Sequence, residues 1–503
     1  MPVFAAIDVG SNAMRIVLAA VDADRTIEIL EVIREPVRLG EDVFTSGMIG
    51  DATIDTAVGA FGRFRTAIDR HGARWTRAVA TSAMREAMNR DILVDRITQI
   101  SGIEVEVIGA EEEARLIHMA VSAKVPLKNH LALLVDIGGG STELTLATEE
   151  GILSTASFTM GSMRLLRTLG DYRKDERAAH QLIREYVEAT TQRIRREIGS
   201  RQVDLCIGTG GNVEVLGELR KEILDKDRDA SLSTAELERI LKRLLALDYG
   251  ERVQQLHLRP DRADVIVPAA IILRKILQVA GVDEVVIPRV GLKDGLLFDM
   301  IEEFHGERRS VRRDQVVASA MQVGRKYQFD EQHAVTVARL AVQLFDATRD
   351  LHNLGIEQRL LLEGAALVHD IGTFIAAADH HKHTQYLLIA TPIVGLSAAQ
   401  MAILGNVARY HRRSQPKPQH ELFQALSSKE RVVVAKLAAL LRLADAMDNE
   451  HAAKVSGFAV EYKKPRVTVR LEGEGDLLLE KWALTKKAQM FEEVFNVRLV
   501  VGG

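Results

Sequence analysis

The fold is decided by Leu133-Leu134-Val135-Asp136-Ile137-Gly138-Gly139-Gly140-Ser141-Thr142-Glu143-Leu144, where an apolar run leads into an acid, three glycines and two hydroxyls. The residues after the glycines alternate in polarity, which predicts a strand, a turn and a second strand. Glycine adopts positive φ angles and lets backbone N–H groups approach an anion closely. Asp136 and Glu143 would repel a phosphate unless a divalent cation lies between them. The stretch therefore predicts either a Mg²⁺–phosphate loop or a glycine-rich hairpin turn.

A second copy of the pattern lies near the N-terminus, in Ile7-Asp8-Val9-Gly10-Ser11-Asn12-Ala13-Met14-Arg15-Ile16. Duplication of a whole motif favours a phosphate-binding role over two unrelated turns. It predicts two similar lobes that face each other with one phosphate chain between them. In this the sequence resembles the actin-like ATPase and sugar-kinase superfamily. That resemblance implies an α/β fold with two duplicated actin-like (ribonuclease H-like) lobes.

Length and composition limit the possible functions. A chain of 503 residues predicts three or more domains. The formal net charge of -4 gives no general attraction to nucleic acid or to a membrane surface. Cys206 is the only cysteine, so no disulfide framework is possible. Without a recognisable signal peptide or a membrane-spanning apolar run, we expect a cytoplasmic protein that binds neither membrane nor nucleic acid.

Three further segments of the first half carry candidate polar residues. Thr81-Ser82-Ala83-Met84-Arg85 places hydroxyls and an arginine at a helix start, which suits an anion or a plain N-cap. Glu111, Glu112 and Glu113 lie in the first turn of another helix, where one of them is a candidate general base. Their spacing does not select one, because acids there also complement the helix dipole. The cluster Gly208-Thr209-Gly210-Gly211 predicts a backbone cradle or a simple turn.

These pieces, in this order, resemble the family of exopolyphosphatases and guanosine pentaphosphate phosphohydrolases over roughly residues 1–305. The segment Glu112-Glu113-Ala114-Arg115-Leu116 together with the triple-glycine hairpin is the most specific part. The resemblance implies Glu113 as the catalytic residue, and Asp136 and Glu143, with Asp8, on the Mg²⁺ side. It implies phosphate contacts from Gly10, Ser11, Asn12, Arg85, Gly138, Gly139, Gly140, Ser141, Thr142, Gly208, Thr209, Gly210 and Gly211.

The second half is predicted to be helical and rich in histidine. His333, His369, His411 and Asp445 each follow apolar residues at helical spacing, and Asp370 adjoins His369. Unpaired polar residues on apolar faces are costly to bury, so their convergence predicts a metal site. The pattern resembles the HD phosphohydrolase superfamily, which implies His333, His369, Asp370 and Asp445 as ligands of Mn²⁺, Fe²⁺, Zn²⁺ or Ni²⁺. His381 and His411, with His380 and His383 as further candidates, are predicted to supply a second metal or to bind phosphate.

The resulting prediction has four domains: lobe I over 1–123, lobe II over 124–305, an all-α HD-type domain over 306–456 and a small α/β cap over 457–503. The predicted function is Mg²⁺-dependent removal of terminal phosphate from inorganic polyphosphate. The alternative is 5′-phosphate removal from guanosine pentaphosphate, where the reacting anhydride is the same. A different class, a nucleotide-switched actin-like assembly or chaperone protein, stays open. The family resemblance also suggests a homodimer.

Overall fold

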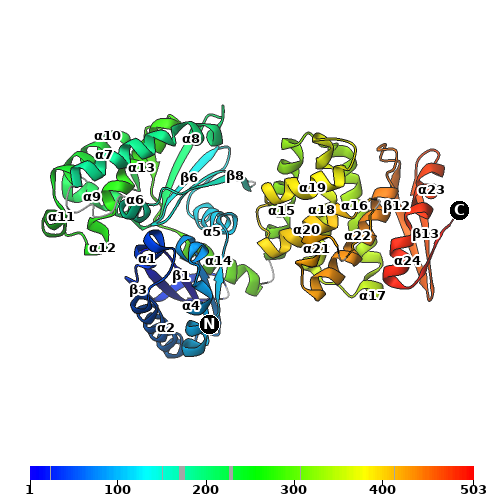
Figure 1. Ribbon diagram of the computed structural model, residues 1–503, viewed down its shortest axis with the longest axis horizontal. Helices are drawn as coiled ribbons and strands as arrows, with labels where there is room; N and C mark the ends of the chain where they lie inside the picture. The colour runs from blue at the N-terminus through cyan, green and yellow to red at the C-terminus, as the bar shows by residue number, and fades with distance from the viewer. Residues whose placement is uncertain are drawn as a thin grey trace. The chain divides into compact units, whose positions relative to one another are not determined.

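The protein is described by a computed structural model that divides the chain into two compact units, residues 1–309 and 310–503 (Figure 1). The structure describes residues 1–22, 24–149, 151–168, 176–225, 230–305, 308–412, 414–417 and 419–502. Among these residues, no helix is both long enough and apolar enough to cross a membrane.

The first unit begins with a five-stranded sheet in the order β3-β2-β1-β4-β5. β1 and β2 form the hairpin predicted around the N-terminal motif, and β4 and β5 continue the sheet in parallel with β1. Nearly every residue of β1 and β2 is buried. The elements are β1 Val3–Val9, β2 Met14–Val21, β3 Ile27–Glu35, α1 Leu39–Ser46, α2 Asp51–His71, β4 Trp75–Ala80, α3 Ser82–Glu86, α4 Arg90–Ser101, β5 Val105–Val107 and α5 Ala110–Ser122.

The second sheet of this unit repeats the topology of the first. Its order is β10-β11-β9-β6-β7-β8, in which β8-β7-β6-β9-β11 corresponds to β3-β2-β1-β4-β5. The duplication read from two short motifs therefore extends to whole sheets. The elements are β6 Ala132–Ile137, β7 Thr142–Thr148, β8 Gly151–Phe158, α6 Ser162–Thr168, α7 Glu176–Ala189, α8 Thr191–Ile198, β9 Leu205–Thr209, α9 Gly211–Leu224, β10 Ser231–Ser233, α10 Thr234–Ala246, α11 Tyr249–Gln255, α12 Pro260–Ala263, α13 Ile266–Ala280 and β11 Glu284–Val286.

The last helix of the first unit, α14 (Leu292–His305), packs on the first sheet, although it follows the second sheet in the chain. Gly295 makes this approach possible, because a Cβ there would lie 1.9 Å from the carbonyl oxygen of Leu116 on α5. Phe304 packs edge-on against Phe4 and Trp75, with ring centroids 5.6 and 4.8 Å away. The chain thus crosses back to the first sheet after it has completed the second one.

The second unit consists of helices followed by a three-stranded sheet, β12-β13-β14. The helices and the sheet share one hydrophobic cluster, which includes Leu440 of α22 and Val469 of β13. Mixed α/β structure is confirmed for the chain. The elements are α15 Arg308–Lys326, α16 Glu331–Ala347, α17 Arg349–His352, α18 Ile356–Val368, η2 Ile371–Phe374, α19 His380–Ala390, α20 Ala398–Arg409, α21 Glu421–Gln424, α22 Ser428–Ala446, β12 Val455–Lys463, β13 Arg466–Gly473, α23 Leu478–Lys487, α24 Gln489–Phe495 and β14 Arg498–Val501.

Candidate active site and candidate metal centre

The turns of the two duplicated hairpins touch each other in the first unit. A Cβ at Gly139 would lie 3.2 Å from Cβ of Ser11, and one at Gly140 would lie 2.3 Å from Oγ of Ser82. We expected positive φ angles in the triple-glycine turn, but Gly138, Gly139 and Gly140 have none. Gly139 is therefore needed for close approach to the other turn, and Gly140 for close approach to Ser82, rather than for an unusual backbone conformation.

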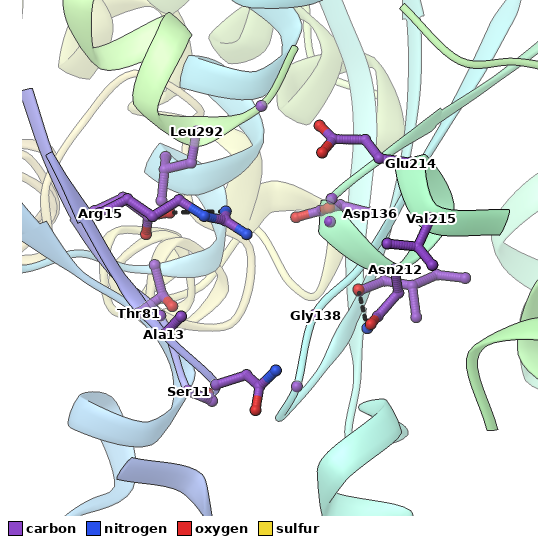
Figure 2. A pocket seen from close by; sticks show the side chains of 18 of the residues that line it. Ser11, Ala13, Arg15, Thr81, Asp136, Gly138, Asn212, Glu214, Val215 and Leu292 are labelled. Atoms are coloured by element: carbon purple, nitrogen blue, oxygen red, sulfur yellow. Dashed lines mark hydrogen bonds and ion pairs between the residues drawn. The ribbon is translucent and has the colours of Figure 1, made fainter. Parts of the chain in front are cut away.

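A cleft of about 590 Å³ opens between the two hairpins. Its walls include Arg15 on one side and Asp136 on the other, and both side chains point into the cleft (Figure 2). The predicted phosphate-binding residues that line it are Gly10, Ser11, Asn12, Gly138, Gly139, Gly140, Ser141, Gly210 and Gly211. Asp8, Glu113 and Glu143 line it as well.

Three carboxylates from three elements meet in this cleft. Glu113 from α5, Asp136 from β6 and Glu143 from β7 offer oxygen atoms that all lie within 4.8 Å of one another. Asp136 and Glu143 are direct cross-strand partners in the hairpin. Like charges placed opposite each other destabilise a sheet, so this arrangement favours a cation between them. We call Glu113, Asp136 and Glu143 the carboxylate cluster.

The carboxylate cluster has strongly perturbed pKa values. Burial raises the pKa of Asp136 to about 7, and the charge of Glu113 adds to the rise. Burial likewise raises the pKa of Glu143 to about 8, with Glu113 and Asp136 adding. Burial also raises the pKa of Glu113, although Arg85 opposes the shift. An all-oxygen set of buried carboxylates that resist ionisation together fits a hard divalent cation such as Mg²⁺, whose charge offsets theirs.

The structure separates the three candidate glutamates, since Glu113 lines the cleft and neither Glu111 nor Glu112 does. Glu113 is buried and accepts a hydrogen bond from Nη1 of Arg85 at 2.7 Å. Glu112 instead accepts two hydrogen bonds from Arg115, each 2.8 Å, and Arg115 also binds Asp299 of α14 at 2.9 Å. Glu112 therefore belongs to the network that attaches α14 to α5. The helix register turns only Glu113 toward the other acids.

Four predicted phosphate-binding residues lie outside the lining of this cleft. Arg85 lies behind Glu113 and also donates to the carbonyl oxygen of Ile108 at 3.0 Å. The Thr142 hydroxyl donates to the carbonyl oxygen of Met160 at 2.9 Å. Thr209 donates to Oδ1 of Asp136 at 3.2 Å, and Gly208 is buried within β9. In this structure the side chains of Arg85 and Thr209 hold Glu113 and Asp136, two acids of the site.

Several cleft residues escaped the sequence analysis. Arg15, Arg34, Asn212, Arg262 and Lys293 line the cleft, yet none was predicted. Arg15 had a detectable signal, since it lies on β2 just after the turn of the first hairpin and pairs with Asp8 in register. The corresponding pair in the second hairpin is Asp136 with Glu143. The first hairpin therefore presents a cation where the second presents an acid.

A second cluster of polar residues lies in the second unit. The four predicted ligands converge there: His333 of α16, His369 after α18, Asp370 beside it and Asp445 of α22. Nε2 of His333 lies 3.6 Å from Oδ1 of Asp445, and Nε2 of His369 lies 3.8 Å from the same atom. Nε2 of His369 also lies 3.7 Å from Oδ2 of Asp370.

The other oxygen of Asp370 faces two more histidines. Oδ1 lies 3.2 Å from Nε2 of His380 and 3.2 Å from Nε2 of His411. Among the candidates His380, His381 and His383, His380 is the one that the described contacts place against Asp370. The Asp370 carboxylate thus lies between two groups of imidazoles, as a bridging ligand does in two-metal sites. We call His333, His369, Asp370, His380, His411 and Asp445 the histidine cluster.

Hydrogen bonds on the far side of the rings fix how these histidines face the histidine cluster. Nδ1 of His369, His380 and His411 each bonds the carbonyl oxygen of the residue three positions earlier. That bond requires the proton on Nδ1 and leaves the Nε2 lone pair facing the cluster. Nε2 of His333 and of His369 is buried without a hydrogen-bond partner. Burial lowers the pKa of His369 to about 4, which keeps its lone pair available at neutral pH.

Comparison with known proteins finds matching family models for both units. A family model described as the Ppx/GppA phosphatase family matches residues 17–304, and one described as Ppx/GppA phosphatase, domain III, matches residues 313–490. A guanosine-5′-triphosphate,3′-diphosphate pyrophosphatase of Vibrio vulnificus is 27% identical over 479 residues, 94% of this chain and 90% of the relative. One of Vibrio parahaemolyticus is 27% identical, over 88% of this chain and 87% of the relative.

A similar solved structure is an exopolyphosphatase from Cytophaga hutchinsonii. It has a TM-score of 0.56 and 27% sequence identity, and the match covers 60% of this chain and 98% of that chain. The relatives found by sequence are thus named for guanosine pentaphosphate, and the solved structure is named for polyphosphate.

Proposed function

This chain belongs to the Ppx/GppA phosphatase family, and from that premise we propose that it removes the terminal phosphate from guanosine 5′-triphosphate 3′-diphosphate. Membership confirms the family resemblance seen in the sequence and the prediction of a phosphoanhydride hydrolase. The sequence had ranked inorganic polyphosphate first. We reverse the order because relatives that match 88% or more of this chain carry the guanosine pentaphosphate name.

The observation that carries the hydrolase proposal is the carboxylate cluster facing two glycine turns in one cleft. Asp136 and Glu143 would hold a divalent cation, assisted by the nearby Asp8. Bound there, the cation supplies positive charge that offsets the charge of the reacting phosphates. The turns Gly10–Asn12 and Gly138–Ser141 bring backbone amides to the same place. In phosphoryl transfer, positioning and charge compensation supply most of the rate.

Glu113 is the proposed general base or water-orienting residue. Burial raises the pKa of Glu113, which strengthens its carboxylate as a base, and the hydrogen bond from Arg85 fixes the carboxylate toward the cleft. The free oxygen of the carboxylate can then accept a hydrogen bond from the attacking water. Arg85 acts here as a positioning residue.

Inorganic polyphosphate is the second candidate substrate. The exopolyphosphatase name of a solved structure with 27% identity favours it. Phosphate release by the purified full chain with Mg²⁺, measured on both substrates, tests the proposal. We expect kcat/KM to be higher for guanosine pentaphosphate. A value at least ten-fold higher for polyphosphate would make it the substrate instead, and no release from either would refute the function.

For the second unit, we propose that the histidine cluster holds one or two transition-metal ions. The buried, unpartnered Nε2 atoms carry this proposal, because imidazole ligands favour first-row transition metals while the carboxylate cluster offers only oxygens. His333, His369, Asp370 and Asp445 would hold one ion, and His380 and His411 would hold the second with Asp370 between them. The HD resemblance, the four-domain division, the homodimer and the cytoplasmic location stay predictions.

A further inference from the structure

The four histidines of the histidine cluster differ in the partner of their Nδ1 atom. In His333 this atom lies 2.8 Å from Oδ2 of Asp448, whereas in the other three it bonds a main-chain carbonyl oxygen. An ionised carboxylate only accepts hydrogen bonds, so Nδ1 of His333 is the donor and carries a proton. Nε2 of the same ring faces the cluster, 3.6 Å from Oδ1 of Asp445. Asp448 thus contacts a proposed ligand from the side that faces away from the cluster.

Both carboxylate oxygens of Asp448 accept hydrogen bonds. The residue follows the end of α22 and is only 2% exposed. Oδ1 accepts a hydrogen bond from the backbone N–H of Ala453 at 2.7 Å, and Oδ2 accepts the one from His333. Among the described residues, the ion pair that Asp448 forms is with His333. A buried carboxylate costs free energy unless it is paired, so the imidazole of His333 is the group that compensates this charge.

A second residue of the same turn holds the face of the His333 ring. The ring of His451 stacks on it, with centroids 3.6 Å apart and planes 7° apart. Nδ1 of His451 lies 3.1 Å from Oδ2 of Asp330, and Asp330 caps α16 by accepting a hydrogen bond from the backbone N–H of His333 at 3.1 Å. The turn over residues 447–454, between α22 and β12, therefore holds the imidazole at one edge and one face.

We propose that Asp448 is a positioning residue of the transition-metal site, which holds the Nδ1 proton of His333 and so keeps the Nε2 lone pair for the metal ion. This inference rests on the metal binding proposed for the histidine cluster. A carboxylate behind a metal-binding histidine fixes the tautomer and the ring orientation, and it makes the imidazole a stronger ligand. Because only His333 has such a partner among the four histidines, the effect is confined to the ion that His333 would hold with His369 and Asp445.

The change Asp448→Asn tests this role, because it preserves the shape of the side chain and reverses one hydrogen bond. The backbone N–H of Ala453 can only donate, so it takes the single amide oxygen of the asparagine. The asparagine NH₂ group then faces Nδ1 of His333, and two N–H groups cannot bond each other. The pairing that remains places the imidazole proton on Nε2, where it blocks the metal ion.

Metal affinity measures the effect without turnover. The full chain and its variants are freed of metal and titrated with Zn²⁺ in competition with a chelating dye. Asp448→Asn should weaken the binding of one Zn²⁺ equivalent by about 10- to 100-fold, and Asp448→Glu, which keeps a carboxylate, should recover part of that loss. The visible absorption of bound Co²⁺ depends on its ligands, so at saturating Co²⁺ the spectrum of Asp448→Asn should differ from that of the wild type.

Glu363→Gln is the matched control. Glu363 is also a buried acid of the second unit, 6% exposed, but its hydrogen bonds in the described part of the chain come from Arg313, one of them at 2.9 Å. We expect a lower melting temperature for Glu363→Gln and a Zn²⁺ affinity within a few-fold of wild type. Mg²⁺-dependent phosphate release, which we assign to the first unit, should stay within a few-fold of wild type in all three variants.

The outcomes separate this inference from the proposed metal site. A Zn²⁺ affinity of Asp448→Asn within a few-fold of wild type, or an equal loss in Glu363→Gln, would overturn the role of Asp448 and leave the metal site standing. If Asp448→Asn does not fold, as judged by its melting curve, Asp448→Glu decides, and an affinity equal to that of the wild type would overturn the role. Wild-type protein that binds neither Zn²⁺ nor Co²⁺ would refute the metal site together with this inference.

Discussion

Exchanging Glu113 for glutamine removes one negative charge from the carboxylate cluster and the only base that we assign to the reaction. The size of the side chain is preserved, so the glutamine can still accept a hydrogen bond from Arg85 through its amide oxygen. Positioned general bases contribute roughly 10²- to 10⁴-fold to rate, so kcat should fall by that factor, about 3–5 kcal/mol in activation free energy.

The stability effect of the same change should be small, because two contributions oppose each other. The hydrogen bond that Arg85 donates at 2.7 Å loses its charged acceptor, which costs about 1–2 kcal/mol. Removing a negative charge within 4.8 Å of Asp136 and Glu143 relieves repulsion of similar size. Thermal melting of the first unit should therefore shift by only a few degrees.

Glu112→Gln is the control for this experiment. Glu112 lies one residue earlier on the same helix but binds Arg115 in the network to α14. We expect a lower melting temperature and a kcat within a few-fold of wild type. Steady-state phosphate release and a melting curve on both variants give the answer. Equal losses of kcat in the two variants, or a Glu113→Gln enzyme within a few-fold of wild type, would refute our assignment of the base.

Three further predictions concern other parts of the chain. Gly210→Ala should lower activity and reduce the free energy of unfolding by about 1–3 kcal/mol, because Gly210 has φ +85° and a Cβ there would lie 2.4 Å from Asp136. The control is Gly62→Ala on α2, which should be neutral or stabilising because nothing lies within 4 Å of a new Cβ. Equal melting curves for the two variants would contradict this prediction. The double change His369→Ala with Asp370→Ala should abolish Mn, Fe, Zn or Ni content by elemental analysis and leave Mg²⁺-dependent hydrolysis largely intact, whereas metal-free wild-type protein whose melting curve ignores added Mn²⁺ would show packed core histidines. Burial and Arg252 lower the pKa of His180 to about 4, so between pH 6.5 and 4 the unfolded chain binds a proton that the folded chain does not, and stability is lost as pH falls through this range. His180→Gln should reduce the dependence of the unfolding free energy on pH by up to about 1.4 kcal/mol per pH unit. Urea unfolding at several pH values measures this dependence, and an unchanged dependence in the variant would contradict the shift.

The sequence by itself determined the local structure around both motifs and the face of each helix that carries polar residues. Asp136, the glycines and Glu143 lie within eight consecutive residues, so their hairpin follows from polarity alternation and glycine alone. The four predicted ligands His333, His369, Asp370 and Asp445 were found in the same way, because a polar residue on an apolar helical face is visible in the helical period. In both cases the prediction depends only on residues that are close together in the sequence.

Tertiary structure decided which of two adjacent residues faces a site, and which residues that are distant in the sequence meet. Only the packing of α5 against the second sheet turns Glu113, and not Glu112, toward Asp136. His380 faces Asp370 while His381 does not, because successive residues of a helix point about 100° apart and the sequence leaves the helix's rotation open. Arg15 and Arg262 meet at Gly211 although they lie on different lobes. Such meetings depend on how whole elements dock, and docking is set by the summed burial of many side chains rather than by the spacing of any motif.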